Sequence, residues 1–157
     1  MKSVLRYPGS KWNLAGRIVE LLPEHKTYLE PYFGSGAVLF TKQPSAIETV
    51  NDLNDDVVNL FQVIQQEPDA LAEKIFLTPY SRKVFDKAWE TRPENEIDKA
   101  LNFVIRSAMS HGFRPTEKSG WKNDVNGREK AYAVKHWNDL PEVIQEMTLR
   151  LKQVQIE

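Results

Sequence analysis

The pair Gly34-x-Gly36 constrains the fold of this chain most strongly, because it joins a strand-like run to a helical one. Residues 27–30 are β-prone, whereas residues 37–40 begin like the first turn of a helix. A second β-prone run over residues 46–50 follows and is closed by the acidic position Asp52. A strand, a glycine turn, a helix and a second strand predict a βαβ unit with a parallel sheet.

The rest of the sequence has helical periodicity. Apolar residues recur at helical spacing in residues 11–22, 55–66, 69–77, 80–90 and 96–110. The sequence predicts a last helix that starts near Asn138, has Pro141 in its first turn and runs through Val154. The fold class is therefore α/β, with a βαβ unit followed by a block of helices.

The glycine turn and the acid beyond it suggest a ligand. Asp52 lies 22 residues after Glu30, about the offset at which an acid at the end of a second strand reaches ribose hydroxyls. A dinucleotide fingerprint would need a third glycine where the chain has Leu39, and the P-loop pattern does not follow either. A nucleoside-like ligand without a pyrophosphate fits, such as S-adenosylmethionine, whose sulfonium cation an anionic Glu30 would favour. A glycine loop that only turns the chain is the alternative interpretation.

The net charge of −1 hides an uneven distribution of charge. Residues 1–26 carry five Lys and Arg against two Asp and Glu, and residues 106–135 carry seven against three. Residues 48–98, in contrast, carry five against twelve. The segment of residues 110–128 is also longer than an ordinary connection between helices, and loops of this length are often functional. Two basic faces of this kind suit a polyanion such as nucleic acid.

Composition excludes several classes of protein and site. The chain has no cysteine, which rules out a disulfide scaffold, a thiolate metal site and a cysteine nucleophile. Its three histidines lack the spacing of metal ligands, so we expect no metal site. No apolar run approaches the length that spans a bilayer, and no secretory signal is recognised, so we expect a cytoplasmic protein without a membrane partner.

Three motifs occur in order: LRYPGSK at residues 5–11, YLEPYFGSGAV at 28–38 and NDLN at 51–54. In these motifs, and over residues 4–66 as a whole, the chain resembles the adenine-specific DNA methyltransferases of the Dam-like family. The resemblance implies a Rossmann-like S-adenosylmethionine-binding unit, which is part of a methyltransferase fold. It further implies methyl transfer to the exocyclic amino group of adenine in double-stranded DNA, in the cytoplasm of a bacterial or phage-infected cell.

The resemblance also assigns roles to individual residues. Tyr7 matches an aromatic position near the methionine moiety of the cofactor, and Lys11 matches a lysine that contacts the cofactor. Asp52 matches the acid that binds the ribose. The positions of the cofactor loop are matched by Glu30, Phe33, Gly34 and Gly36. The family plan then implies a cofactor-binding part over residues 1–66 and a helical target-recognition region over residues 67–157.

Basic and aromatic residues provide the candidate DNA contacts. Arg6 matches a family position that faces the DNA target. The later helical region offers cations interleaved with rings, which suit phosphate contact and the stacking or wedging of a ring. The candidate DNA-binding residues are Arg6, Arg106, His111, Arg114, Lys118, Trp121, Lys122 and Arg128. A solvated, charged loop is the alternative interpretation of this region.

The catalytic tetrapeptide of the family, Asp-Pro-Pro-Tyr, does not occur in this sequence, so we assign no catalytic residue. In the family, its Asp side chain and a Pro carbonyl accept the hydrogens of the adenine amine while its Tyr stacks on the flipped-out base. One hypothesis is therefore the N-terminal portion of such an enzyme, inactive or nearly so alone. Another is a truncated module that binds DNA, S-adenosylmethionine or both without catalysis. A different nucleoside-binding α/β protein is a third.

Overall fold

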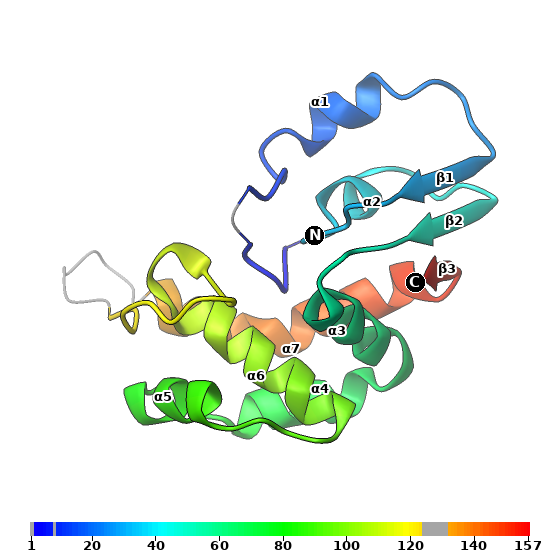
Figure 1. Ribbon diagram of the computed structural model, residues 1–157. Helices are drawn as coiled ribbons and strands as arrows, with labels where there is room; N and C mark the ends of the chain where they lie inside the picture. Colours follow the sequence, from blue (N-terminus) through cyan, green and yellow to red (C-terminus); the bar gives the residue numbers. More distant parts are fainter. Residues whose placement is uncertain (1, 8, 124–131) are drawn as a thin grey trace.

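The computed structural model of the chain describes residues 2–7, 9–123 and 132–157. The strands β1 (Thr27–Glu30), β2 (Ile47–Val50) and β3 (Val154–Ile156) form a parallel sheet in the order β1-β2-β3 (Figure 1). The predicted βαβ unit is confirmed, since β1 and β2 pair in parallel and the helix α2 (Ala37–Thr41) connects them.

The strand β3 corrects the prediction of a helix that continues through Val154. The last helix ends at Leu151, and β3 then pairs with β2 so that Val154 lies opposite Glu48. Three residues are too few to reveal a strand period, and the pairing depends on a segment far away in the chain. Among the described residues, β1 has no strand partner at its other edge.

The helices largely follow the predicted periodicity. They are α1 (Ala15–Glu20), α2, α3 (Asp55–Gln66), α4 (Pro68–Leu77), α5 (Arg82–Glu90), α6 (Glu96–Met109), the short 3₁₀ helix η1 (His111–Phe113) and α7 (Tyr132–Leu151). Side chains of Asn54, Ser81 and Asn95 accept hydrogen bonds from backbone amides in the first turns of α3, α5 and α6. The helix predicted over residues 11–22 is shorter in the structure, where only its middle is helical.

The helix α7 begins at Tyr132, well before the predicted start near Asn138. Pro141 consequently lies inside the helix and not in its first turn. Ala133 and Trp137 are buried one turn apart ahead of this proline, so packing of the early turns outweighs the backbone hydrogen bond that proline cannot donate. The sequence signal that marks proline as a helix start was misleading here.

One hydrophobic core extends from the sheet into the helices. Helix α3 lies between the sheet and the helices α6 and α7 (Figure 1), and its residues Leu60, Phe61 and Ile64 are fully buried. Helix α6 packs on α3 and helix α7 packs on α4, adding Phe103 and Ile144 to the same core. The division of function at residues 66 and 67 stays a prediction, because both parts contribute to this core.

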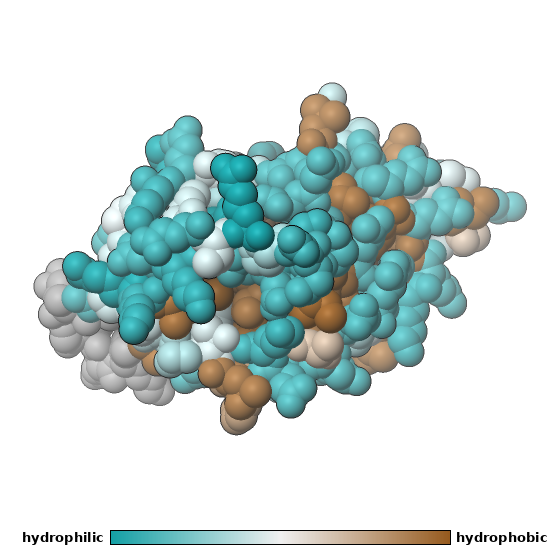
Figure 2. Space-filling model, turned by 60° about the horizontal axis from the view of Figure 1, so that its bottom comes forward, coloured by the Kyte–Doolittle hydropathy of each residue, from teal (hydrophilic) through white to brown (hydrophobic). Residues whose placement is uncertain are grey.

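The face of the molecule in Figure 2 is mostly hydrophilic. Figure 2 shows one face on which hydrophobic side chains occur in small, separate groups among hydrophilic ones. On the sheet, however, Leu29 and Ile47 are 61% and 52% exposed, so one face of the sheet stays uncovered by the residues that the structure describes. No helix in the described ranges has the length and apolar character needed to cross a membrane.

Candidate functional site

A hollow of about 320 Å³ lies beyond the carboxyl ends of β1 and β2, and we call it the glycine-turn hollow. In an open parallel sheet this is where ligands usually bind, because the loops that leave the strands diverge there. The hollow is lined by Tyr7, Gly9, Ser10, Lys11, Glu30, Tyr32, Phe33, Gly34, Ser35, Ala37, Val38 and Asp52. Six of the seven candidate cofactor residues are in this set; Gly36 is not.

The glycine turn and the acid predicted to act with it lie in direct contact. The backbone amide of Gly34 donates a hydrogen bond of 2.7 Å to Oδ2 of Asp52. The amide of Asn54 donates to Oδ1 of the same carboxylate at 3.0 Å. Two backbone donors therefore hold the Asp52 carboxylate at the wall of the hollow, where its remaining lone pairs can accept further hydrogen bonds.

The two glycines of the turn meet different surroundings. Both have a positive φ, which a side chain would strain. A Cβ on Gly36 would lie 2.5 Å from a ring atom of Phe40 and 2.7 Å from one of Phe33. A Cβ on Gly34 would have nothing within 4 Å. Gly36 thus lets the aromatic core close beneath the turn, whereas Gly34 leaves open space in the hollow.

The N-terminal segment forms the opposite wall of the glycine-turn hollow. The Tyr7 hydroxyl accepts a hydrogen bond of 3.2 Å from the side-chain amide of Asn54, which caps α3. The hydroxyls of Ser10 and Ser35 are 2.7 Å apart and join this segment to the glycine turn. Lys11, which is exposed, donates to the carbonyl of Gly9. Residues from three separate motifs of the sequence therefore surround one space.

The carboxyl of Glu30, which lines this hollow, has a raised pKa. Burial raises the pKa of its carboxyl to about 7, although hydrogen bonds from the Tyr28 hydroxyl and the backbone of Leu39 and the charge of Lys42 act in the opposite direction. A cation placed beside this carboxyl would favour its ionised form.

Phe33 is only 4% exposed and packs edge-on against Phe61 at 4.7 Å between ring centroids, so most of its surface belongs to the core.

Six of the residues that line the hollow were not selected from the sequence, and three of these six, Ser10, Tyr32 and Ser35, carry hydroxyl groups. Each lies within one of the motifs that carry the family resemblance. Their closeness in sequence to the selected residues could therefore have identified them as part of the site. Of the three, Ser35 is buried and Tyr32 is 77% exposed.

A second hollow of about 740 Å³ adjoins the first and shares Tyr7 and Ser10 with it. We call it the Arg6 hollow. It lies between the N-terminal segment and the start of α7, and its lining includes Arg6, Phe113 and Tyr132. The Arg6 guanidinium is 4.9 and 4.8 Å from the ring centroids of Phe113 and Tyr132 and donates to the Tyr132 hydroxyl.

Lys122 joins this group. Its ammonium lies 4.5 Å from the ring centroid of Phe113 and 5.4 Å from that of Tyr132. The backbone amide of Lys122 donates to the carbonyl of Met109, which folds the segment after α6 back on itself. The structure thus gathers Arg6 and Lys122, two of the candidate DNA residues, around the same pair of rings.

The other candidate DNA residues lie elsewhere. Arg106 donates to the carbonyl of Ala88 on α5, and Lys118 pairs with Asp86 of the same helix at 3.2 Å. Trp121 packs on Tyr80 and beneath the guanidinium of Arg82. His111 is exposed, Arg114 lies 3.8 Å from Glu117, and Arg128 is outside the described residues. The structure therefore does not bring all these residues together in one surface.

The described residues contain no group of three or more His, Cys, Asp or Glu side chains that could hold a metal ion.

Known proteins resemble this chain over most of its length. A family model described as D12 class N6 adenine-specific DNA methyltransferase matches residues 7–157. A DNA N-6-adenine-methyltransferase of Escherichia phage P1 is 34% identical over 70 residues, which are 45% of this chain and 9% of that protein. The type II methyltransferase M.MjaIII of Methanocaldococcus jannaschii is 25% identical over 154 residues, 83% of this chain and 53% of that protein.

A DNA adenine methylase of Vibrio cholerae is 29% identical over 85 residues, which are 52% of this chain and 30% of that protein. The chain thus spans about half, or less, of the length of these relatives. The family match covers the glycine-turn hollow, the helices and β3 together. The chain therefore belongs to the D12 class of N6 adenine-specific DNA methyltransferases.

Proposed function

We propose that the glycine-turn hollow binds S-adenosylmethionine in a Rossmann-like unit, and that the chain contributes to methyl transfer to the exocyclic amino group of adenine in double-stranded DNA. The observation that carries this proposal is the contact between the Gly34 amide and the Asp52 carboxylate in one hollow. Open space beside Gly34 supports it, because a ligand can approach the backbone there.

The chemistry of the lining residues fits this cofactor. Asp52 would accept hydrogen bonds from the ribose hydroxyls, since a carboxylate offers more lone pairs than its two backbone donors use. Glu30 would lie near the positive charge of the cofactor, which would favour its ionised form. Tyr7 and Lys11 would hold the methionine end from the N-terminal segment. When bound, S-adenosylmethionine supplies an activated methyl group.

The Arg6 hollow supports an approach of DNA from the side of the N-terminal segment. This hollow adjoins the proposed cofactor site through Tyr7 and Ser10. Its lining includes the Arg6 guanidinium and the Tyr132 ring. Cations of this kind contact phosphates, whereas rings can stack on bases. We expect Arg6 and Lys122 to contact DNA, and the residues on the α5 side to contribute less.

The amine of adenine needs more than these residues provide. Its lone pair is delocalised into the ring, so a group that accepts its hydrogens must orient it, and the Asp-Pro-Pro-Tyr motif that does so in the family is missing from this sequence. We therefore expect the 157-residue chain by itself to transfer little or no methyl to DNA. Robust transfer of radiolabelled methyl to an adenine-containing duplex by this chain would contradict that expectation.

A non-catalytic module that binds S-adenosylmethionine, DNA or both is the second candidate, and the missing motif favours it. The two candidates differ in the gene: an open frame that continues past Glu157 into Asp-Pro-Pro-Tyr would favour a portion of an enzyme, whereas an in-frame stop there would favour the module. Both candidates predict cofactor binding.

Calorimetric titration of the chain with S-adenosylmethionine tests the proposed site. Asp52→Ala should weaken binding by about 1.5–3 kcal/mol, because it removes hydrogen bonds between a charged acceptor and the ribose. Asp55→Ala is the matched control, since Asp55 is an exposed acid three residues further on that does not line the hollow. Unchanged affinity of Asp52→Ala, or equal losses in both variants, would contradict the proposed site.

A further inference from the structure

A row of polar contacts crosses the sheet on the face that carries Glu30. Tyr28 and Glu30 are two residues apart on β1, so their side chains lie on the same face. The Tyr28 hydroxyl donates a hydrogen bond of 2.9 Å to Oε2 of Glu30. On the neighbouring strand, Glu48 is the register partner of Tyr28. Tyr28 therefore stands between the glycine-turn hollow and the buried acid of β2.

Glu48 is held by two cations, and we call Lys42, Glu48 and Arg150 the ion cluster. The Lys42 ammonium lies 2.6 Å from Oε1 of Glu48. Arg150, on the last turn of α7, binds both carboxylate oxygens at 2.5 and 2.8 Å. The side chains of Lys42, Glu48 and Arg150 are only 3%, 2% and 12% exposed. The carboxylate is thus fully paired in spite of its burial.

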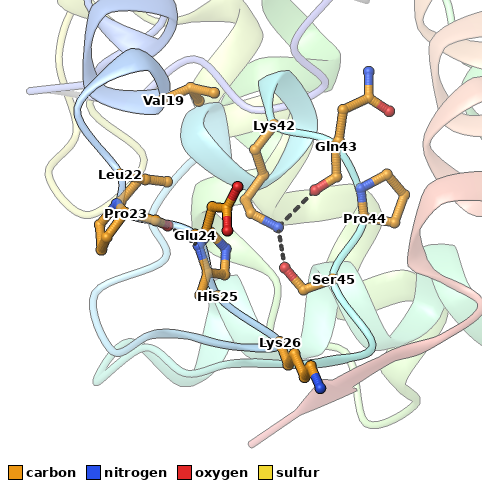
Figure 3. A pocket seen from close by; sticks show the side chains of 10 residues that line it. All are labelled: Val19, Leu22, Pro23, Glu24, His25, Lys26, Lys42, Gln43, Pro44 and Ser45. Carbon is orange, nitrogen blue, oxygen red and sulfur yellow. Dashed lines mark hydrogen bonds between the residues drawn. The ribbon is translucent and has the colours of Figure 1, made fainter.

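The ion cluster also fixes the ring of Tyr28. Lys42 donates to the carbonyl of Gln43 at 2.7 Å and to the hydroxyl of Ser45 at 2.8 Å, as Figure 3 shows at the turn between α2 and β2. With these partners and Glu48, the ammonium has little freedom to move. It lies 4.6 Å from the centroid of the Tyr28 ring, a cation–π contact. The ring is therefore packed against a cation whose position is determined.

We propose that Tyr28 is a positioning residue of the cofactor site, whose hydroxyl holds the Glu30 carboxylate in the orientation that receives the cationic part of the cofactor. The inference rests on the proposed function, because it takes the glycine-turn hollow to be the cofactor site. Tyr28 does not line that hollow. It acts only through Glu30, and the ion cluster keeps its ring in place.

The direction of the effect follows from the charges around Glu30. The Tyr28 hydroxyl donates a stronger hydrogen bond to the ionised carboxylate of Glu30 than to its neutral carboxyl, so it favours the ionised form. Burial together with Glu30 raises the pKa of Tyr28, so the hydroxyl stays protonated at neutral pH. The charged or titratable groups around Glu30 and Tyr28 are Tyr7, Lys11, His25, Tyr32, Lys42, Glu48, Asp52 and Arg150. None of these is altered in Tyr28→Phe, so the loss of one donor to Glu30 is isolated.

The test is the affinity of the 157-residue chain for S-adenosylmethionine between pH 6 and pH 9, measured by calorimetry for the wild type and Tyr28→Phe. Loss of the donor should raise the pKa of Glu30 further, so that fewer molecules hold the ionised carboxylate near pH 7. We expect binding by the variant to be about fivefold weaker near pH 7 but at most about twofold weaker near pH 9, where Glu30 is ionised in both proteins and only its orientation differs. Titration of the cofactor itself cancels in the ratio of the two affinities.

Two control variants make the result specific. Tyr80→Phe removes another tyrosine hydroxyl bond, that to the carbonyl of Lys122, away from the glycine-turn hollow, and should leave affinity unchanged at every pH. In a Glu30→Gln background, Tyr28→Phe should no longer change the pH dependence, because the titrating carboxyl is gone.

The outcomes separate this inference from the proposed function. A loss of affinity in Tyr28→Phe that is the same at all pH values would show a merely structural role and overturn the inference. An unchanged affinity would overturn it too. Failure of the wild-type chain to bind S-adenosylmethionine would overturn the proposed function and the inference together.

Discussion

At the scale of single residues, the glycine turn shows that one residue type meets two different needs. Gly36 lies at the start of α2 with φ near +70°, and the rings of Phe33 and Phe40 occupy the space where its side chain would be. Gly34 has φ near +52° but open space around it. The first need belongs to folding and the second to the proposed cofactor site, although both positions look alike in the motif.

This difference predicts unequal losses of stability. Gly36→Ala should lower the free energy of unfolding by about 3 kcal/mol, because it combines a left-handed backbone with a clash in the aromatic core. Gly34→Ala should lower it by about 1 kcal/mol, from backbone strain alone. Urea denaturation of both variants measures this. Equal losses would mean that the ring packing around Gly36 is wrong.

At the scale of elements, α7 connects both ends of the molecule. Its first turns bring Tyr132 and His136 to the Arg6 hollow, and its last turn brings Arg150 to Glu48. The chain then turns directly into β3, which pairs with the strand that carries Glu48. One helix therefore contributes to the Arg6 hollow and to the ion cluster, and the chain that leaves it forms β3 of the sheet.

The ion cluster should stabilise the folded chain more than the exposed ion pairs of the same molecule do. Burial alone would raise the pKa of Glu48, but hydrogen bonds from Arg150, Lys42 and the Ser45 amide lower it to about 2. Glu48→Gln would leave two buried cations without an anion and should lower the free energy of unfolding by about 3 kcal/mol or more. Glu96→Gln, whose pair with Lys99 is exposed, should change it by less than about 0.5 kcal/mol. Denaturation at neutral pH compares the two, and equal effects would contradict the assigned burial.

His136 on α7 should make stability depend on pH. Burial lowers its pKa to about 4, and the nearby charges of Arg6 and Lys122 add to this effect, whereas Asp139 opposes it. Because this pKa lies below the unfolded value of 6.5, the unfolded chain takes up the proton first as the pH falls. The contribution of His136 is thus fully present above pH 6.5 and is lost progressively towards pH 4.

The measurement is a comparison of the wild type with His136→Gln at pH 7 and pH 4.5. From pH 7 to pH 4.5, the free energy of unfolding of the variant should rise by about 2 kcal/mol relative to that of the wild type. Glu30 acts in the opposite direction over nearly the same range, since its raised pKa makes folding favour the protonated form. Only the difference between the two proteins therefore isolates His136, and a difference that does not vary with pH would refute its assignment as a buried neutral histidine.

At the scale of the whole molecule, the basic residues form more than one group. Arg6 lines the Arg6 hollow, beside the proposed cofactor site, and the Lys122 ammonium packs on two aromatic rings of its lining. Arg106 and Lys118 contact α5, where Asp86 lies within 3.2 Å of the Lys118 ammonium. DNA that reaches the glycine-turn hollow through the neighbouring Arg6 hollow would contact the first group.

The salt dependence of DNA binding tests this arrangement. Affinity for a duplex should fall steeply with added salt, because each cation bound to a phosphate releases counterions. Lys122→Gln should reduce the slope of log affinity against log salt by about 1, whereas Lys118→Gln should leave it nearly unchanged. Fluorescence anisotropy with a labelled duplex measures both slopes. A larger effect of Lys118→Gln would place the DNA on the α5 side.

This chain spans only part of the length of its relatives, and parts of its sheet are uncovered in the described residues. M.MjaIII, which this chain matches over most of the chain's own length, is nearly twice as long as the matched part. In the described residues, β1 has no partner at one edge and Leu29 and Ile47 are exposed on one face. Leu29 directly precedes Glu30, which lines the glycine-turn hollow, but it lies on the opposite face of β1.

The sequence by itself determined the local parts of this protein. It predicted the βαβ unit, the periods of the helices and the pairing of the glycine turn with Asp52, because hydrophobic spacing, turn residues and motif spacing act over short stretches of chain. Its errors lie where distant segments decide. The strand β3 exists only through its pairing with β2, and α7 starts early because Trp137 is packed in the core.

Only the tertiary structure decided which side chains meet. It separated Gly34 from Gly36 by what surrounds them, and it divided the basic residues between the Arg6 hollow and α5. It also joined Arg150 to Glu48, two residues that no local pattern connects. The physical reason is the same in each case: contact energies depend on distance in space, and a sequence pattern reports only distance along the chain.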